Sequence, residues 1–139
     1  MTMLPTDLLG GWSLSRQVHD RLAGEHREVA GQAVLEREGP DRVRWHEAGT
    51  MRWTGHEVPV SRTLYVVRAG HGWQVHFEDG RVFHPWAVGT EVEHPCTPDH
   101  YRGLIEVEGN PVHRWTVRWS ARGPHKDYTM TTEHLRLDA

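Results

Sequence analysis

Apolar and polar residues alternate with a period of two through much of the chain, and this alternation restricts the possible folds more than any other feature. In the segment HRWTVRWSA, one face of the predicted strand carries Trp115, Val117, Trp119 and Ala121. The segments VRWHEAGTMRW and GWQVHFEDG repeat the pattern with Val43, Trp45, Met51 and Trp53, and with Trp73, Val75 and Phe77. Such alternation is typical of antiparallel strands with one buried face and one solvated face.

Turn signals separate these segments at nine places, from Ala23-Gly24 to Gly123-Pro124, which leaves about ten strands. No β-α-β rhythm is present, and the only helical candidate is a short opening turn around Pro5–Leu9. Short connections favour a meander over Greek-key crossovers. Closing the sheet into a barrel also removes the exposed edge strands that so apolar a sheet would otherwise have. The sequence therefore predicts an all-β, antiparallel up-and-down barrel of about ten strands with a short N-terminal helical turn. The opening LLGGW, in which Gly-Trp enters the first strand, resembles the start of calycin-like barrels, so we expect a calycin-like fold.

Length and composition exclude several classes of protein. The 139 residues predict a single domain over residues 1–139. Cys96 is the only cysteine, so no internal disulfide is possible, and the start has no signal-peptide pattern. No apolar run is long enough for a membrane helix, and the net charge of −3 without a basic stripe argues against nucleic-acid binding. We expect a cytoplasmic protein with a small-molecule partner. The sequence leaves open whether the protein forms a homodimer.

Two charged residues are predicted to point inward. Arg16 is in phase with Trp12 and Leu14, and Glu47 is in phase with Trp45. An unpaired buried charge costs several kcal/mol. These residues must therefore pair with one another, or they line a cavity that holds water and a ligand. A barrel of ten strands is wide enough for a cavity, and we expect one that takes an apolar or aromatic metabolite.

The stretch HPCTPDHYRG, residues 94–103, concentrates reactive side chains and allows three interpretations. His84, His94 and Cys96 can form a site for zinc or another soft metal. Alternatively, Cys96 is a nucleophile activated by His94, with Tyr101 or Lys126 polarising a carbonyl. The interpretation we prefer makes them polar cavity-wall residues that orient a ligand, with Cys96 as a small hydrophobe. A purely structural role, in which His94–Asp99 organise a turn, competes with all three.

Two functions are therefore possible. The protein is either a small enzyme, namely a cyclase, isomerase or lyase, or a barrel that only binds its ligand. The candidate catalytic residues are His84, His94, Tyr101 and Tyr128. The candidate ligand-binding residues are Arg16, Trp45, Glu47, Tyr65, Cys96, Trp119 and Lys126. We expect no bound metal and no cofactor. Of the catalytic candidates, His84 and His94 lie on successive predicted strands, where they can approach each other.

Four ordered motifs resemble a family of single-domain bacterial and fungal proteins of unknown function. The stretches LLGGWSLSRQVHD, FEDGRVFH, HPCTPDHYRG and RGPHKDYTM match its patterns L-L-G-x-W-x-L-x-R, D-G-R-x-F-H, H-x-C-x-x-D-x-Y and G-P-x-K-D-Y. The family signature falls on Trp12, Arg16, Asp79, Gly80, Arg81, Phe83, His84, His94, Cys96, Asp99, Tyr101, Gly123, Pro124, Lys126, Asp127 and Tyr128. At His125 the family more often has a basic residue. The resemblance covers nearly the whole chain and implies no activity.

A weaker likeness is to haem barrels of the nitrobindin type, which are similar in their ten strands and in the opening Gly-Trp. In those barrels a histidine of the last strand ligates haem, and His134 in TTEHLRL would be that residue here. A haem- or metal-binding barrel is therefore the alternative function.

Overall fold

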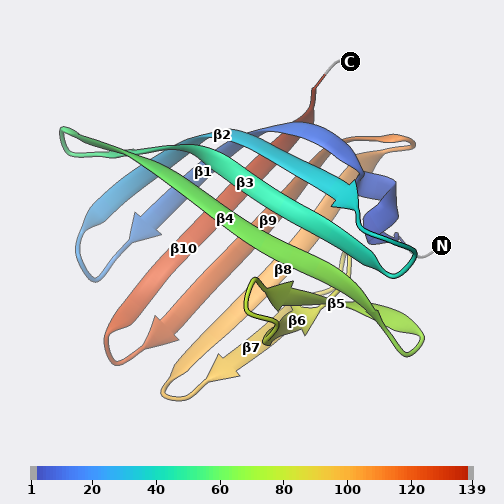
Figure 1. Cartoon of the computed structure of the whole chain (residues 1–139). Coiled ribbons are helices and arrows are strands. Elements are labelled where there is room, and N and C mark those ends of the chain that lie inside the picture. Colours follow the sequence, from blue (N-terminus) through green and yellow to red (C-terminus); the bar gives the residue numbers. More distant parts are fainter. Residues whose placement is uncertain (1–2, 138–139) are drawn as a thin grey trace.

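The chain forms a single curved antiparallel sheet in a computed structural model that describes residues 3–137 (Figure 1). A short 3-10 helix, η1 (Pro5–Leu8), precedes ten strands. The first five are β1 (Gly10–Asp20), β2 (Glu25–Arg37), β3 (Arg42–Trp53), β4 (His56–Ala69) and β5 (Gly72–Phe77). The others are β6 (Val82–Pro85), β7 (Val92–Cys96), β8 (Asp99–Gly109), β9 (Val112–Gly123) and β10 (Lys126–Arg136). The predicted strand number, opening turn and meander are confirmed, and all nine turn signals fall between strands.

The strand order makes the sheet an up-and-down barrel that is almost closed. It runs β6-β5-β4-β3-β2-β1-β10-β9-β8-β7, so the first long strand pairs with the last. Between residues 3 and 137, no hydrogen-bonded ladder joins β6 to β7, and these two short strands face each other across a seam. The loop between them is tied to β8 instead, because Val88 bridges Ile105 and Gly89 N–H donates to the Ile105 carbonyl. None of the described helical segments is long and apolar enough to span a membrane.

The barrel interior is filled at one end by tryptophan. Trp12, Trp45, Trp115 and Trp119 are all buried, as the alternation predicts. The Trp12 and Trp115 rings meet edge to face at 5.8 Å between centroids, and Trp45 meets Trp115 at 5.4 Å. Edge-to-face pairs of this kind are favourable beyond the area they bury. This end of the barrel is therefore a packed core.

The same end is covered by η1, which lies across it in Figure 1. Leu8 is fully buried, and its carbonyl accepts a hydrogen bond from Trp12 Nε1 at 2.9 Å. Arg136 stacks on the Trp12 ring and donates to the carbonyls of Leu9 and Val112. The opposite end carries the β1–β2, β3–β4, β7–β8 and β9–β10 turns, and we call it the mouth.

Two facing glycines allow β2 and β3 to approach closely between the two ends. Gly31 and Gly49 are partners in the ladder. A Cβ atom on either one would overlap backbone atoms of the other strand. Side chains are therefore excluded here, and Gly49 forms part of the wall of an internal cavity.

Candidate functional site

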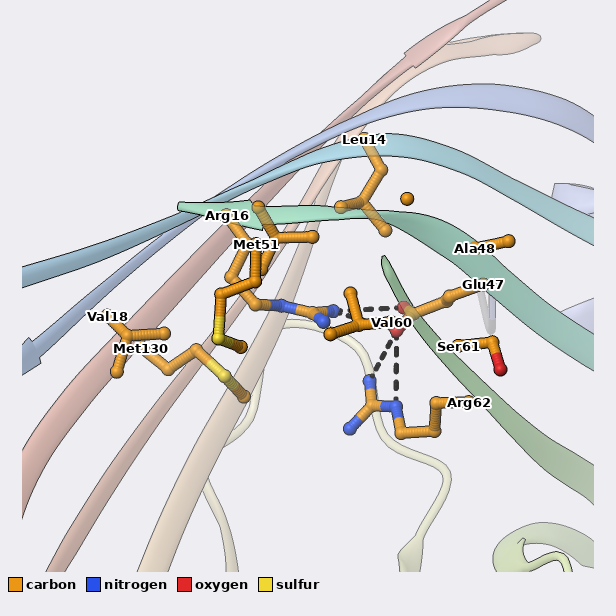
Figure 2. A pocket seen from close by; sticks show the side chains of 12 residues that line it. Leu14, Arg16, Val18, Glu47, Ala48, Met51, Val60, Ser61, Arg62 and Met130 are labelled. Atoms are coloured by element: carbon orange, nitrogen blue, oxygen red, sulfur yellow. Dashed lines mark hydrogen bonds and ion pairs between the residues drawn. The ribbon is translucent and has the colours of Figure 1, made fainter. Parts of the chain in front are cut away.

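A cavity of about 130 Å³ lies between the tryptophan core and the mouth, and Figure 2 shows the side chains that line it. Strands β1 to β4 and β10 form its wall, which is mostly aliphatic or thioether. The apolar lining residues are Leu14, Val18, Val29, Ala48, Met51, Val60 and Met130, and the polar ones are Arg16, Glu47, Ser61 and Arg62. The cavity is partly open. An engineered cavity of similar size, about 150 Å³, holds benzene, so this one accommodates about one aromatic ring.

Three charged side chains meet at one side of the cavity. Arg16 Nη2 donates to both carboxylate oxygens of Glu47, at 2.9 and 3.0 Å, and its Nε donates to Thr132 Oγ1 at 2.7 Å. Arg62 donates from Nε to Glu47 Oε1 at 3.1 Å, and its Nη2 forms an ion pair with the same oxygen at 3.0 Å. The inward charges predicted from sequence therefore both pair with each other and line a cavity. We call Arg16, Glu47 and Arg62 the charge triad.

The triad holds Glu47 in its charged form although its side chain is only 5% exposed. Burial alone would raise the pKa of the carboxyl, but the positive charges of Arg62 and Arg16 outweigh it and lower the pKa below its usual value. Two cations and one anion thus remain charged beside the cavity at neutral pH.

His134 lies one layer deeper, within the tryptophan core. Its ring stacks on Trp115 at 3.6 Å between centroids, and Trp45 approaches it at 6.5 Å. Its Nδ1 donates to the Trp115 carbonyl, and burial lowers its pKa to about 4, so the imidazole is neutral. The Nε2 atom is buried, finds no hydrogen-bond partner among residues 3–137, and does not line the cavity.

The surroundings of His134 do not fit the haem that the likeness to nitrobindin-type barrels suggests. A haem ligated by Nε2 needs open space beside that atom for the macrocycle, and here the atom is enclosed in the tryptophan core. Within residues 3–137, no group of three or more His, Cys, Asp or Glu side chains is arranged to hold a metal ion. In particular, His84, His94 and Cys96 do not form such a group.

A stack of aromatic rings lies at the seam, and the two candidate histidines flank it. Phe83 stacks on Phe77 at 4.5 Å and on Trp119 at 4.8 Å between centroids. The Trp119 ring in turn lies over Gly103, where a Cβ would come within 2.7 Å of it. His84 and His94 each contact Phe83 edge-on, at 4.8 and 5.3 Å. The two histidines therefore come together around a shared ring.

His84 and His94 differ in burial. His84 is 3% exposed, and its Nδ1 donates to the Pro85 carbonyl at 2.7 Å, which leaves Nε2 as an acceptor. Burial lowers the pKa of His84 to about 4. His94 is half-buried nearer the mouth, on the short strand β7, and its ladder partner is Tyr101.

The remaining mouth residues form a polar row across β7 to β10. The cross-strand partners are His94 with Tyr101, Tyr101 with Ala121, and Ala121 with Tyr128. Lys126 Nζ donates to Tyr101 Oη at 2.5 Å and lies 3.4 Å from Asp99 Oδ2. Burial raises the pKa of Tyr128. Cys96 shares the inward parity of His94, but it lies exposed at the end of β7.

The other predicted ligand-binding residues lie outside the cavity. Trp45 is in the core, and Trp119 belongs to the ring stack at the seam. Tyr65 is on the face of β4 opposite to Leu64 and Val66, with the Arg42 guanidinium 3.9 Å from its ring centre, so it cannot reach the interior.

Sequence reasoning missed Arg62, the third member of the triad. The signal was available, because Arg62 has the parity of Leu64 and Val66 along one predicted strand. A two-residue turn at Thr54-Gly55 also places Arg62 directly opposite Glu47 in the β3–β4 hairpin. Thr132, which accepts from Arg16, could have been found by its alternation with His134.

Fold and cavity together define the chain as a ten-stranded antiparallel β-barrel with a partly charged interior pocket. It belongs to a family of unknown function, DUF6314, whose model matches residues 8–136. Among curated proteins, none matches the sequence.

Several solved structures share this fold at low sequence identity. The S-type phycobiliprotein lyase CPES from Guillardia theta has a TM-score of 0.74 and 12% identity, over 97% of this chain and 91% of that one. The redesigned β-barrel mFAP1, bound to DFHBI, has a TM-score of 0.52 and 14% identity, over 95% and 97% of the two chains. A fluorescence-activating β-barrel designed de novo has a TM-score of 0.53 and 16% identity, over 99% and 100%.

Proposed function

We propose that this protein binds an apolar or aromatic small molecule inside its barrel. The observation that carries the proposal is the cavity of about 130 Å³, with aliphatic and thioether walls and a charge triad at one side. Pockets for small molecules combine apolar walls with a few converging polar groups in this way. Support also comes from two barrels of the same fold, a phycobiliprotein lyase and a design bound to DFHBI.

Filling the cavity is expected to abolish binding. Met130 lines the cavity from β10, and the neighbouring Thr131 is exposed on the outer face of the same strand. Met130→Trp places an indole where the ligand ring would lie, and Thr131→Trp adds the same side chain outside the barrel. Ligand-observed NMR with benzoate, 3-phenylpropanoate and octanoate is expected to show saturation transfer for the native protein and for Thr131→Trp. Met130→Trp is expected to show none, and equal signals from both variants would place binding outside the cavity.

Conversion of the bound molecule is a second candidate function, because a hydrogen-bonded polar row lies at the mouth. Lys126, Tyr101 and His94 are neighbours there, and Tyr128 lies in the same row. Histidine and tyrosine side chains transfer protons to and from substrates when they lie within hydrogen-bond reach. This arrangement favours an isomerase, cyclase or lyase, in which proton transfer is the chemistry that a small barrel needs to supply.

The two histidines are expected to respond differently to replacement. His84→Ala removes a buried ring and leaves the Pro85 carbonyl without its donor, a loss of about 1–3 kcal/mol of stability that lowers the melting temperature by several degrees. His94 is half-buried, so His94→Ala is expected to keep the melting temperature within a few degrees. If His94 contacts the ligand, its loss weakens binding or turnover by about 1–3 kcal/mol. Thermal melts and titrations on both variants measure the two quantities, and unchanged affinity in His94→Ala would exclude it from the site.

A further inference from the structure

We propose that the molecule bound in the cavity is an anion, and that its carboxylate is held by Arg62 and Arg16. This inference rests on the proposed binding function and specifies the chemical class of the ligand. It follows from the charge of the cavity, from the unused hydrogen-bond donors of the two arginines, and from the position of Arg62.

The cavity wall carries an excess of one positive charge. Arg16 and Arg62 contribute two cations, and Glu47 is the only acid among the described residues that line the cavity. The two histidines packed nearby, His84 and His134, carry no charge at neutral pH because both rings are buried. A positive charge held at an apolar wall is poorly solvated, so it attracts an anionic group more strongly than it would in water.

The hydrogen bonds of the triad leave one end of each guanidinium unused. Arg16 donates through Nε and Nη2, whereas Arg62 donates through Nε and places Nη2 at ion-pair distance from Glu47. Within the described part of the chain, the Nη1 atom of neither arginine donates to a protein acceptor, and Figure 2 shows one nitrogen of Arg62 pointing away from Glu47. Because Glu47 binds both side chains, it holds the two guanidiniums close together. Paired guanidiniums with free N–H groups suit the geometry of a carboxylate.

Burial separates the roles of the two arginines. The Arg16 side chain is 12% exposed and the Arg62 side chain is 35% exposed. Arg62 also lies close enough to Tyr128 and His84 for its charge to influence their pKa values. Arg62 is therefore the arginine that faces the entering ligand, and Arg16 is the deeper partner. Glu47 neutralises one of the two cations, which keeps the empty cavity stable and leaves the charge for one anion.

Three matched pairs of probes test the charge of the ligand directly. Benzoate, 3-phenylpropanoate and octanoate are compared with benzamide, 3-phenylpropanamide and octanamide by isothermal titration calorimetry and ligand-observed NMR at pH 7.5. Each amide has nearly the shape of its acid and lacks only the charge. We expect at least one acid to bind tenfold or more tightly than its amide.

Variants of the triad then identify the residues that bind the anion. Arg62→Met is expected to lower the affinity for the preferred acid at least tenfold and to leave the affinity for its amide unchanged. Glu47→Gln removes the competing carboxylate and is expected to strengthen acid binding severalfold. Arg118→Met is the matched control, because this arginine is 61% exposed on the outer face of β9 and its loss changes the net charge equally. If Arg62→Met fails to fold, Arg62→Gln serves in its place, because it also removes the charge and keeps an amide N–H that can donate to Glu47, and the same tenfold loss of acid affinity is expected.

The outcomes separate this inference from the proposed function. Acids and amides that bind with equal affinity would overturn the anion inference and leave the binding barrel intact. The same holds if Arg62→Met and Arg118→Met lower acid affinity by the same factor. If none of the six probes binds at 10 mM, both the anion inference and the proposed binding function are overturned.

Discussion

Lowering the pH from 7 to 4 is expected to remove most of the stability of the folded barrel. Burial lowers the pKa of His84 and of His134 from 6.5 to about 4 in the folded protein. Between these two values the unfolded chain binds more protons than the folded one, so stability is fully present above pH 6.5 and is lost as the pH falls towards 4. A shift of this size corresponds to roughly 3 kcal/mol for each histidine, at 1.36 kcal/mol per pKa unit. The combined loss is comparable to the whole stability of a typical small domain, about 5–15 kcal/mol.

Urea unfolding at pH 7.5, 6.5, 5.5 and 4.5 measures this loss, and substitutions assign it. His84→Gln and His134→Gln each remove one titrating group, so each variant is expected to show a shallower slope of unfolding free energy against pH. His71→Gln is the control, because His71 is exposed in the β4–β5 turn. A slope that is the same in all four proteins would show that neither buried ring controls the acid sensitivity.

Removing Glu47 alone is expected to cost far more stability than removing the whole charge triad. Glu47→Ala leaves Arg16 and Arg62 facing each other at an apolar wall without their shared acceptor. Breaking a buried ion pair in this way typically costs about 3–5 kcal/mol. In the triple variant Arg16→Met/Glu47→Leu/Arg62→Met no charge is left unpaired. Replacing a buried ionic group with apolar residues is often neutral or stabilising.

The comparison uses urea unfolding of both variants, with Glu133→Ala as the control. Glu133 pairs with Arg114 on the outer surface, where the two side chains are 41% and 38% exposed, and its loss is expected to cost less than about 1 kcal/mol. A triple variant that folds well and no longer binds acids would indicate that the triad serves binding. A triple variant as unstable as Glu47→Ala would instead make the triad a structural requirement of the barrel.

The fold was predictable because its information is local. The alternation in HRWTVRWSA assigns Trp115, Trp119 and Ala121 to the interior, and the turn signals mark the strand ends, without any knowledge of the other strands. Hairpin register is local too, which is why the pairing of Glu47 with Arg62 follows from the turn at Thr54-Gly55.

Contacts between strands that do not form a ladder could be predicted only as alternatives. Arg16 reaches Glu47 across β2, so the sequence left their pairing and a cavity as alternatives, and the structure shows both. The gathering of His84 and His94 around Phe83 depends on where the two edges of the sheet meet, because β6 and β7 share no ladder. The expectation that Tyr65 binds the ligand was avoidable, because the alternation along its strand places Tyr65 on the face opposite to Leu64 and Val66.

The seam between β6 and β7 gives the barrel an adjustable circumference. Elsewhere around the barrel, widening would break backbone hydrogen bonds. At the seam, side chains make the contact instead, because Phe83 of β6 stacks on Trp119 of β9 and meets His94 of β7 edge-on. Each stacked pair contributes about 0.5–1.5 kcal/mol beyond the apolar area that it buries. We therefore expect substitutions at Phe83 to change the width of the barrel at the seam while the ladders of the other strands stay intact.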